Sequence, residues 1–143
     1  MHRAETDWIV SRLADIAPQE LSPMLNIGSS TLEFRTQKQP WIENNLIKPL
    51  EARGIRVVHA DLKSGPGIDL TADLTTDEGF KTLAAVGARS IMICNVLEHV
   101  VDPGAFANRC LELVGPKGYA IVTVPHSYPH HRDPITGQNA QAS

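Results

Sequence analysis

The chain has 143 residues, 42% of them hydrophobic and 20% charged, and its formal net charge at neutral pH is −3. This length predicts one globular domain, and a mildly acidic chain without a run of Lys and Arg is not expected to bind nucleic acid. Two cysteines are too few for a secreted disulfide framework, and no segment approaches the roughly 20 apolar residues of a membrane span, so we expect a cytoplasmic protein without a membrane partner.

Apolar periodicity and the positions of Gly and Pro predict the helices. Four helices are expected, starting at Asp7, near Trp41, at Asp77 and at the Asp102-Pro103 pair. Residues 29–40 are polar and are expected to be irregular. Pro49 should kink or break the second helix, because proline cannot donate the backbone hydrogen bond and clashes with the preceding turn.

Five short apolar runs are expected to be strands: residues 23–28, 55–60, 68–72, 90–94 and 119–124. Strands that alternate with helices predict a mostly parallel sheet with helices on both faces, which is a three-layer, doubly wound α/β fold. We expect this domain to span residues 1–136 and to be followed by a polar tail, residues 137–143, which lacks large apolar side chains.

Polar or glycine residues follow every expected strand. In open α/β sheets, ligands bind beyond the carboxyl ends of the strands, near the point where the strand order reverses. The positions there are Gly28-Ser29-Ser30, Asp61, Asp73, Asn95 to His99, and Pro125 onward. The sequence therefore predicts a ligand site at that end of the sheet.

Several of these segments resemble class I S-adenosylmethionine (SAM)-dependent methyltransferases of a small-molecule subgroup. The similar segments are Met24 to Ser30, Gly65 to Leu70 with Asp73-Leu74, Asn95 to Val100, Gly115 to Gly118, and Thr123 to Pro125. The resemblance extends from about residue 24 to residue 134. It implies a Rossmann-like transferase with strand order 3-2-1-4-5, SAM as cofactor and a small-molecule methyl acceptor. Strands 6 and 7 of that family are expected to be missing, as in a short or C-terminally truncated member.

The same resemblance implies a set of cofactor-binding residues: Asn26, Gly28, Ser29, Ser30, Asp61, Leu62, Asp73, Leu74 and Asn95. Gly28 would let the backbone approach the methionine part of the cofactor. Asp61 would accept hydrogen bonds from the ribose hydroxyls. Asp73 and the Leu74 amide would bind adenine. A plain turn at Gly28, a solvated acid at Asp61 and a turn or cap aspartate at Asp73 are the alternatives.

Two departures from the family pattern bear on affinity. Asn26 stands where the family usually has an acid, and Ser30 replaces the second glycine of the loop. An amide can form hydrogen bonds but offers no charge to the ammonium group of the cofactor. These departures favour weak or absent cofactor binding, and with it a catalytically inactive methyltransferase-like domain kept for binding or assembly.

Glu98 and His99 are the candidate catalytic residues. His99 could act as a base near neutral pH when the acceptor must lose a proton, whereas a structural role is favoured more for Glu98 than for His99. Local packing at a helix start is the alternative for His99. His126, Tyr128 and His130 lie in a proline-rich loop that we expect to face the substrate. A metal site in this loop is disfavoured, because no second cluster with fixed ligand spacing accompanies the histidines.

The last expected strand carries Ile121, Val122 and Val124 and would form an exposed apolar edge. We expect a second copy in a homodimer, another partner or the C-terminal segment to cover it. A nicotinamide dehydrogenase is a third functional alternative. It fits poorly, because residues 28–33 retain one of the three glycines of the dinucleotide fingerprint.

Overall fold

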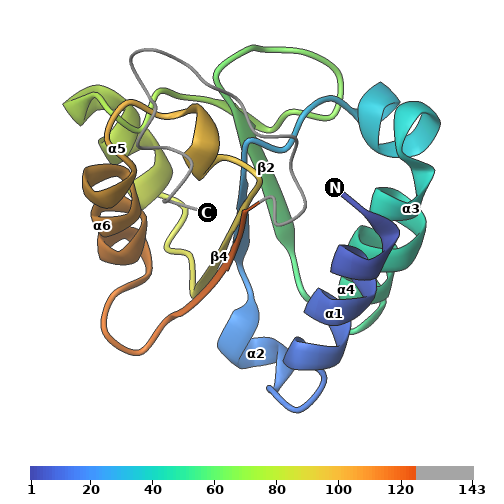
Figure 1. Cartoon of the computed structure of the whole chain (residues 1–143). Helices are drawn as coiled ribbons and strands as arrows, with labels where there is room; N and C mark the ends of the chain where they lie inside the picture. Colours follow the sequence, from blue (N-terminus) through green and yellow to red (C-terminus); the bar gives the residue numbers. More distant parts are fainter. Residues whose placement is uncertain (125–143) are drawn as a thin grey trace.

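A computed structural model of the chain describes residues 1–124 (Figure 1). The described strands are β1 (Met24–Ile27), β2 (Val57–Asp61), β3 (Leu70–Thr71), β4 (Ser90–Cys94) and β5 (Tyr119–Thr123). They form one sheet in the order β3-β2-β1-β4-β5, and every neighbouring pair is parallel. The predicted doubly wound α/β fold and its strand order are confirmed.

Helices cover both faces of this sheet, as Figure 1 shows. The helical elements are α1 (Arg3–Leu13), α2 (Pro18–Leu21), η1 (Phe34–Lys38), α3 (Pro40–Ile42), η2 (Glu43–Ile47), α4 (Lys48–Ala52), α5 (Asp77–Ala84), η3 (Leu97–His99) and α6 (Pro103–Val114). Helices α1, α3 and α4 lie on one face, and α5 and α6 lie on the other. The strand order reverses between β1 and β4, so that the two halves of the fold diverge there.

The core consists of two apolar clusters, one on each face of the sheet. Along β1, Met24 joins the cluster under α1, whereas Leu25 and Ile27 join the cluster under α5 and α6. This alternation is expected because successive strand side chains point to opposite faces. All three are at least nine-tenths buried, and each contributes about 1.5–3 kcal/mol relative to an exposed position.

Two predictions near the N-terminal half of the chain are wrong. Helix α1 begins at Arg3, so Asp7 lies inside the helix and does not cap it. Residues 29–40 are not irregular throughout, because they contain the π-helical turn η1. The hydroxyl of Thr31 accepts a hydrogen bond from the backbone N–H of Phe34 at 3.2 Å, in the manner of a helix cap.

Pro49 does not break the helix that precedes it. The chain passes through the π-helical turn η2, in which the N–H of Lys48 bonds to the carbonyl of Glu43, and then continues as α4. A wider turn of this kind accommodates a residue that cannot donate to the carbonyl four positions back. The predicted kink is therefore replaced by a local change of helix type.

Strand β3 is shorter than the predicted residues 68–72. Here the carboxylate of Asp69, and not a backbone carbonyl, accepts a hydrogen bond from the backbone N–H of His59 at 2.8 Å. The backbone N–H of Asp69 donates to the carbonyl of His59. Regular pairing with β2 begins only at Leu70. A side-chain contact between residues ten positions apart is not visible in hydropathy, which explains the error.

Strand β5 leaves apolar side chains on the surface. Val122 in β5 and Val124 just after it are 43% and 39% exposed, as the sequence predicts for an edge strand. The prediction is wrong for Ile121, which is 8% exposed and packs in the core because its side chain points to the covered face of the sheet. The expectations for strands 6 and 7, for the tail at 137–143 and for the domain boundary at residue 136 concern a part of the chain that lies outside the described residues. Within residues 1–124, no helix is both long enough and apolar enough to cross a membrane.

Candidate functional site

The loop after β1 is joined to the end of β2 at the carboxyl end of the sheet. The backbone N–H groups of Gly28 and Ser29 both donate to the carbonyl of Ala60, at 2.9 and 3.1 Å. The N–H of Ser30 donates to Oδ2 of Asp61 at 2.9 Å. The structure therefore brings the predicted residues of these two loops together.

Three residues at this end of the sheet have left-handed backbone conformations: Gly28 (φ +69°), Ser30 (φ +59°) and Asn95 (φ +59°). A Cβ atom on Gly28 would lie 2.7 Å from Cγ2 of Val96, so glycine is needed there for contact with the loop after β4. Ser and Asn adopt this conformation at some cost, and such residues cluster at functional sites. Both occur where β1 and β4 diverge.

Asp61 is an acceptor held in place by backbone amides. Besides the contact with Ser30, its Oδ1 accepts the N–H of Leu62 at 2.7 Å and that of Lys63 at 3.5 Å. The neighbouring Leu62 side chain is 67% exposed. A fixed carboxylate beside an exposed apolar side chain can bind a hydroxyl group and an aromatic ring of the same ligand.

Arg35 fixes the shape of these loops, and the sequence analysis missed it. Its side chain is only 2% exposed and donates to the carbonyls of Ser29 (3.5 Å), Ser30 (2.5 Å) and Gly67 (3.0 Å). Nε lies 3.7 Å from a carboxylate oxygen of Glu43. Burial lowers the pKa of Arg35, and the negative charge of Glu43 opposes this. The guanidinium thus ties the glycine loop to the segment before β3.

The side chain of Asn26 contacts a side chain of the neighbouring strand β2. Its Nδ2 lies 3.1 Å from Nδ1 of His59, and both side chains are buried, with 8% of each exposed. Asn26 of β1 and His59 of β2 are directly paired residues of these two parallel strands. The amide of Asn26 is therefore engaged in a contact with another uncharged side chain.

The burial of His59 predicts a fold that loses stability in acid. Burial, and then the positive charge of Arg35, lower the pKa of His59 from 6.5 to about 4, while Asp69 opposes the shift. In the unfolded chain, His59 takes up a proton as the pH falls below 6.5. In the folded chain, it does so only at about pH 4. We expect the free energy of unfolding to decrease by about 3 kcal/mol across that window.

Urea denaturation from pH 7 to 4 measures this effect. Substituting His59→Gln should remove that part of the pH dependence, whereas His99→Gln, at an exposed position, should retain it. An unchanged pH dependence in the His59 variant would contradict the assignment.

Asp73 and Leu74 follow β3, and the N–H of the preceding Ala72 donates to the carbonyl of Asp61 at 3.0 Å. Asp73 is exposed, and its Oδ1 accepts both the N–H and the hydroxyl of Thr75, at 2.9 and 2.6 Å, which lowers the pKa of this carboxyl. The Leu74 side chain is 2% exposed and belongs to the core. Within residues 1–124, no hydrogen bond joins Asp73 to the loops after β1 and β2.

The two candidate catalytic residues in the loop after β4 differ in their exposure to solvent. The His99 side chain is 71% exposed, and its Nε2 lies 3.6 Å from Oε2 of Glu98, whose side chain is 21% exposed. Oε1 of Glu98 is buried and has no hydrogen-bond partner among the described residues. An acceptor without a partner is costly, and a ligand with a donor group would satisfy it.

Asn95 is held by a residue that the sequence analysis did not single out. Its Nδ2 donates to the carboxylate of Glu5 on α1, at 3.0 and 3.3 Å. The same carboxylate accepts the hydroxyl of Thr123 at the end of β5, at 2.8 Å. Glu5 resembles any surface acid in the first turn of a helix, so the sequence carries no signal for this contact.

The predicted substrate-binding residues His126, Tyr128 and His130 lie outside the described residues. Within the described part of the chain, no group of three or more His, Cys, Asp or Glu side chains is placed to hold a metal ion.

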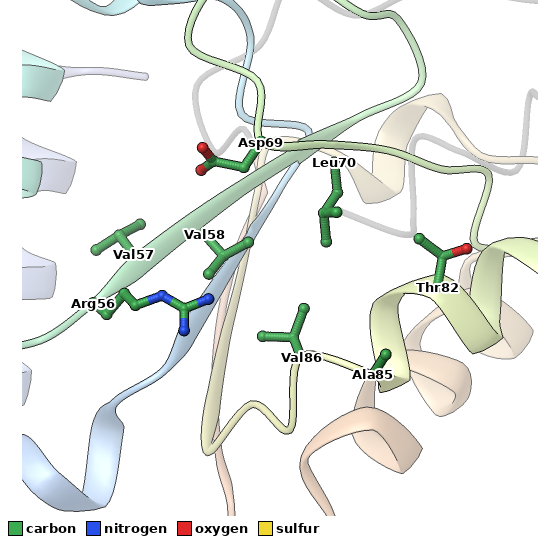
Figure 2. Close-up of a pocket in the computed structure, with 8 residues that line it drawn as sticks. All are labelled: Arg56, Val57, Val58, Asp69, Leu70, Thr82, Ala85 and Val86. Carbon is green, nitrogen blue, oxygen red and sulfur yellow. The ribbon is translucent and has the colours of Figure 1, made fainter.

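A cavity of about 480 Å³ lies near the start of β2, away from the carboxyl end of the sheet. Val58, Leu70 and Val86 point toward one another in it, whereas the carboxylate of Asp69 points away (Figure 2). It contains none of the predicted site residues, and we do not assign the ligand site to it.

Comparisons of the chain with family models, with curated proteins and with solved structures gave no match. The candidate site is therefore defined by its geometry. It consists of the loops after β1, β2 and β4 at the reversal point of a parallel sheet, with Asp61 as the fixed acceptor.

Proposed function

We propose that the chain is the cofactor-binding core of a SAM-dependent methyltransferase that acts on a small molecule. The observation that carries the proposal is the bond between Ser30 and Asp61, which joins the glycine loop after β1 to the acid at the end of β2. In a doubly wound sheet, this is the place where nucleoside-containing ligands bind. The sequence motifs at these loops favour SAM among such ligands.

The residues at this end of the sheet suit the parts of SAM. The carboxylate of Asp61 can accept hydrogen bonds from ribose hydroxyls, and the exposed Leu62 can pack against adenine. The exposed backbone of Gly28 leaves room for the methionine part. Asp73 is engaged by Thr75 but has a second carboxylate oxygen for the adenine amino group.

When bound, SAM supplies the electrophilic methyl group. Transfer is an in-line displacement, so alignment by these loops supplies much of the acceleration. A base is needed only for acceptors that lose a proton, and the exposed imidazole of His99 is available for it. Glu98, which contacts His99, would orient the ring, and its unsatisfied oxygen could accept a donor from the acceptor molecule.

A binding domain without catalytic activity is the second candidate. The observation that favours it is the pairing of Asn26 with His59, which leaves strand β1 without a charged group for the cofactor.

Calorimetric titration with S-adenosylhomocysteine and with NAD⁺ tests the cofactor assignment. We expect binding of S-adenosylhomocysteine only, whereas binding of NAD⁺ alone, or of neither, would contradict the proposal. Transfer of labelled methyl from SAM to a panel of carboxylate, amine, thiol and hydroxyl acceptors then separates the two candidates. Binding without transfer to any acceptor class would support the binding domain.

A further inference from the structure

A carboxylate from the first helix reaches the ends of two neighbouring strands, β4 and the edge strand β5. Glu5, in the first turn of α1, accepts hydrogen bonds from Asn95, at the end of β4, and from Thr123, at the end of β5. These partners are 90 and 118 residues away in the sequence. Ile9 and Leu13, which are buried against the sheet, fix α1 in this position.

The donors that surround Glu5 are all uncharged. They are the Asn95 amide, the Thr123 hydroxyl and, at 3.3 Å, the backbone N–H of His2. The ion pairs found within residues 1–124 do not involve Glu5. The amino group of Met1 donates to Gln39 instead. Glu5 therefore brings a negative charge to the β4 side of the carboxyl end, and no cationic side chain among residues 1–124 forms an ion pair with it.

Two other polar residues at this end, Asn26 and Asp61, are engaged in contacts of their own. Asn26 is neutral and paired with His59 inside the sheet. The carboxylate of Asp61 lies on the β2 side and is held by the amides of Ser30 and Leu62. A ligand that spans the carboxyl end from β2 to β4 would thus meet a hydroxyl acceptor at one end and, at the other, a carboxylate that has no ion-pair partner among residues 1–124.

We propose that Glu5 binds the ammonium group of the amino-acid part of the cofactor, an inference that rests on the proposed function. Glu5 then supplies, from a helix outside the glycine loop, the negative charge that Asn26 does not provide. A half-buried carboxylate forms a charge-assisted hydrogen bond with an ammonium group, and its loss weakens binding by about 10- to 100-fold.

Two ligands that differ in the amino-acid part test this proposal. S-adenosylhomocysteine carries the ammonium group, whereas 5′-methylthioadenosine keeps the adenosine and lacks the whole amino-acid part. Substituting Glu5→Gln should weaken binding of S-adenosylhomocysteine by about 10- to 100-fold and leave binding of methylthioadenosine unchanged within about twofold. Glu112→Gln, at an exposed position on α6, is the matched control and should change neither affinity.

Equal weakening of both ligands, or no weakening, would overturn the role of Glu5 and leave the proposed function standing. Failure of the unsubstituted chain to bind either ligand would remove the proposed function and the inference with it. Should the Glu5 variant not fold, the unsubstituted chain still decides: N-acetyl-S-adenosylhomocysteine, which lacks the ammonium group, should bind at least about tenfold more weakly than S-adenosylhomocysteine. Equal affinity for these two would contradict the proposal.

Discussion

Substituting Arg35→Met is expected to destabilise the fold by about 3 to 5 kcal/mol, the cost of removing one partner from a buried charged network. Methionine fills a similar volume but cannot donate to the carbonyls of Ser30 and Gly67. It also leaves the carboxylate of Glu43, which is 14% exposed, without its guanidinium. Urea denaturation at pH 7 measures the change in the free energy of unfolding.

Two further variants make this test specific. Arg109→Met removes an ion pair with Asp77, whose side chain is 90% exposed, and long hydrogen bonds to the carbonyls of Leu74 (3.4 Å) and Thr76 (3.3 Å). Because these groups are near the surface, it should cost clearly less than Arg35→Met. Adding Glu43→Gln to the Arg35 variant should restore part of the lost stability, because the buried charge is then gone. Similar losses for the Arg35 and Arg109 variants would show that Arg35 does not hold the loops together.

Substituting Asp61→Ala is expected to weaken binding of S-adenosylhomocysteine by about 10- to 100-fold, since hydrogen bonds to a charged acceptor contribute roughly 1.5–3 kcal/mol. The carboxylate is fixed by the amides of Ser30 and Leu62, so it needs no reorganisation to receive hydroxyl donors. Titration calorimetry at constant salt gives the ratio of dissociation constants.

The control for this prediction is Asp15→Ala, an exposed acid just beyond the other end of α1, which should bind the ligand normally. Adenosine should lose as much affinity as S-adenosylhomocysteine in the Asp61 variant, because both carry the ribose hydroxyls. Asp61→Ala with full affinity for both ligands would eliminate Asp61 as the ribose acceptor.

The sheet is predictable because local patterns define it. The continuous apolar run at residues 90–94 and the β-branched run that ends at Asp61 are typical of buried parallel strands, and both lie where the sequence places them. The cap at Asp102 and the proline after it likewise start α6 as expected. Strand β3 and the π-helical turns differ, because the contact of Asp69 with His59 and the accommodation of Pro49 depend on tertiary structure.

The residues of the candidate site likewise fall into a group that the sequence predicts and a group that it does not. Gly28, Ser30 and Asn95 follow strands and Asp61 ends β2, so strand prediction alone brings them to one end of the sheet. Arg35 and Glu5 lie in or near helices, and their partners are distant in the sequence.

Chemical-shift mapping of the ¹⁵N-labelled chain during titration with S-adenosylhomocysteine shows whether the ligand binds at the carboxyl end of the sheet. We expect the amide resonances of Gly28, Ser30, Leu62 and Asn95 to shift together. Those of Arg56, Val57 and Val86, which line the cavity in Figure 2, should stay in place. Shifts confined to that cavity, or no shifts at saturating ligand, would contradict a cofactor site at the carboxyl end of the sheet.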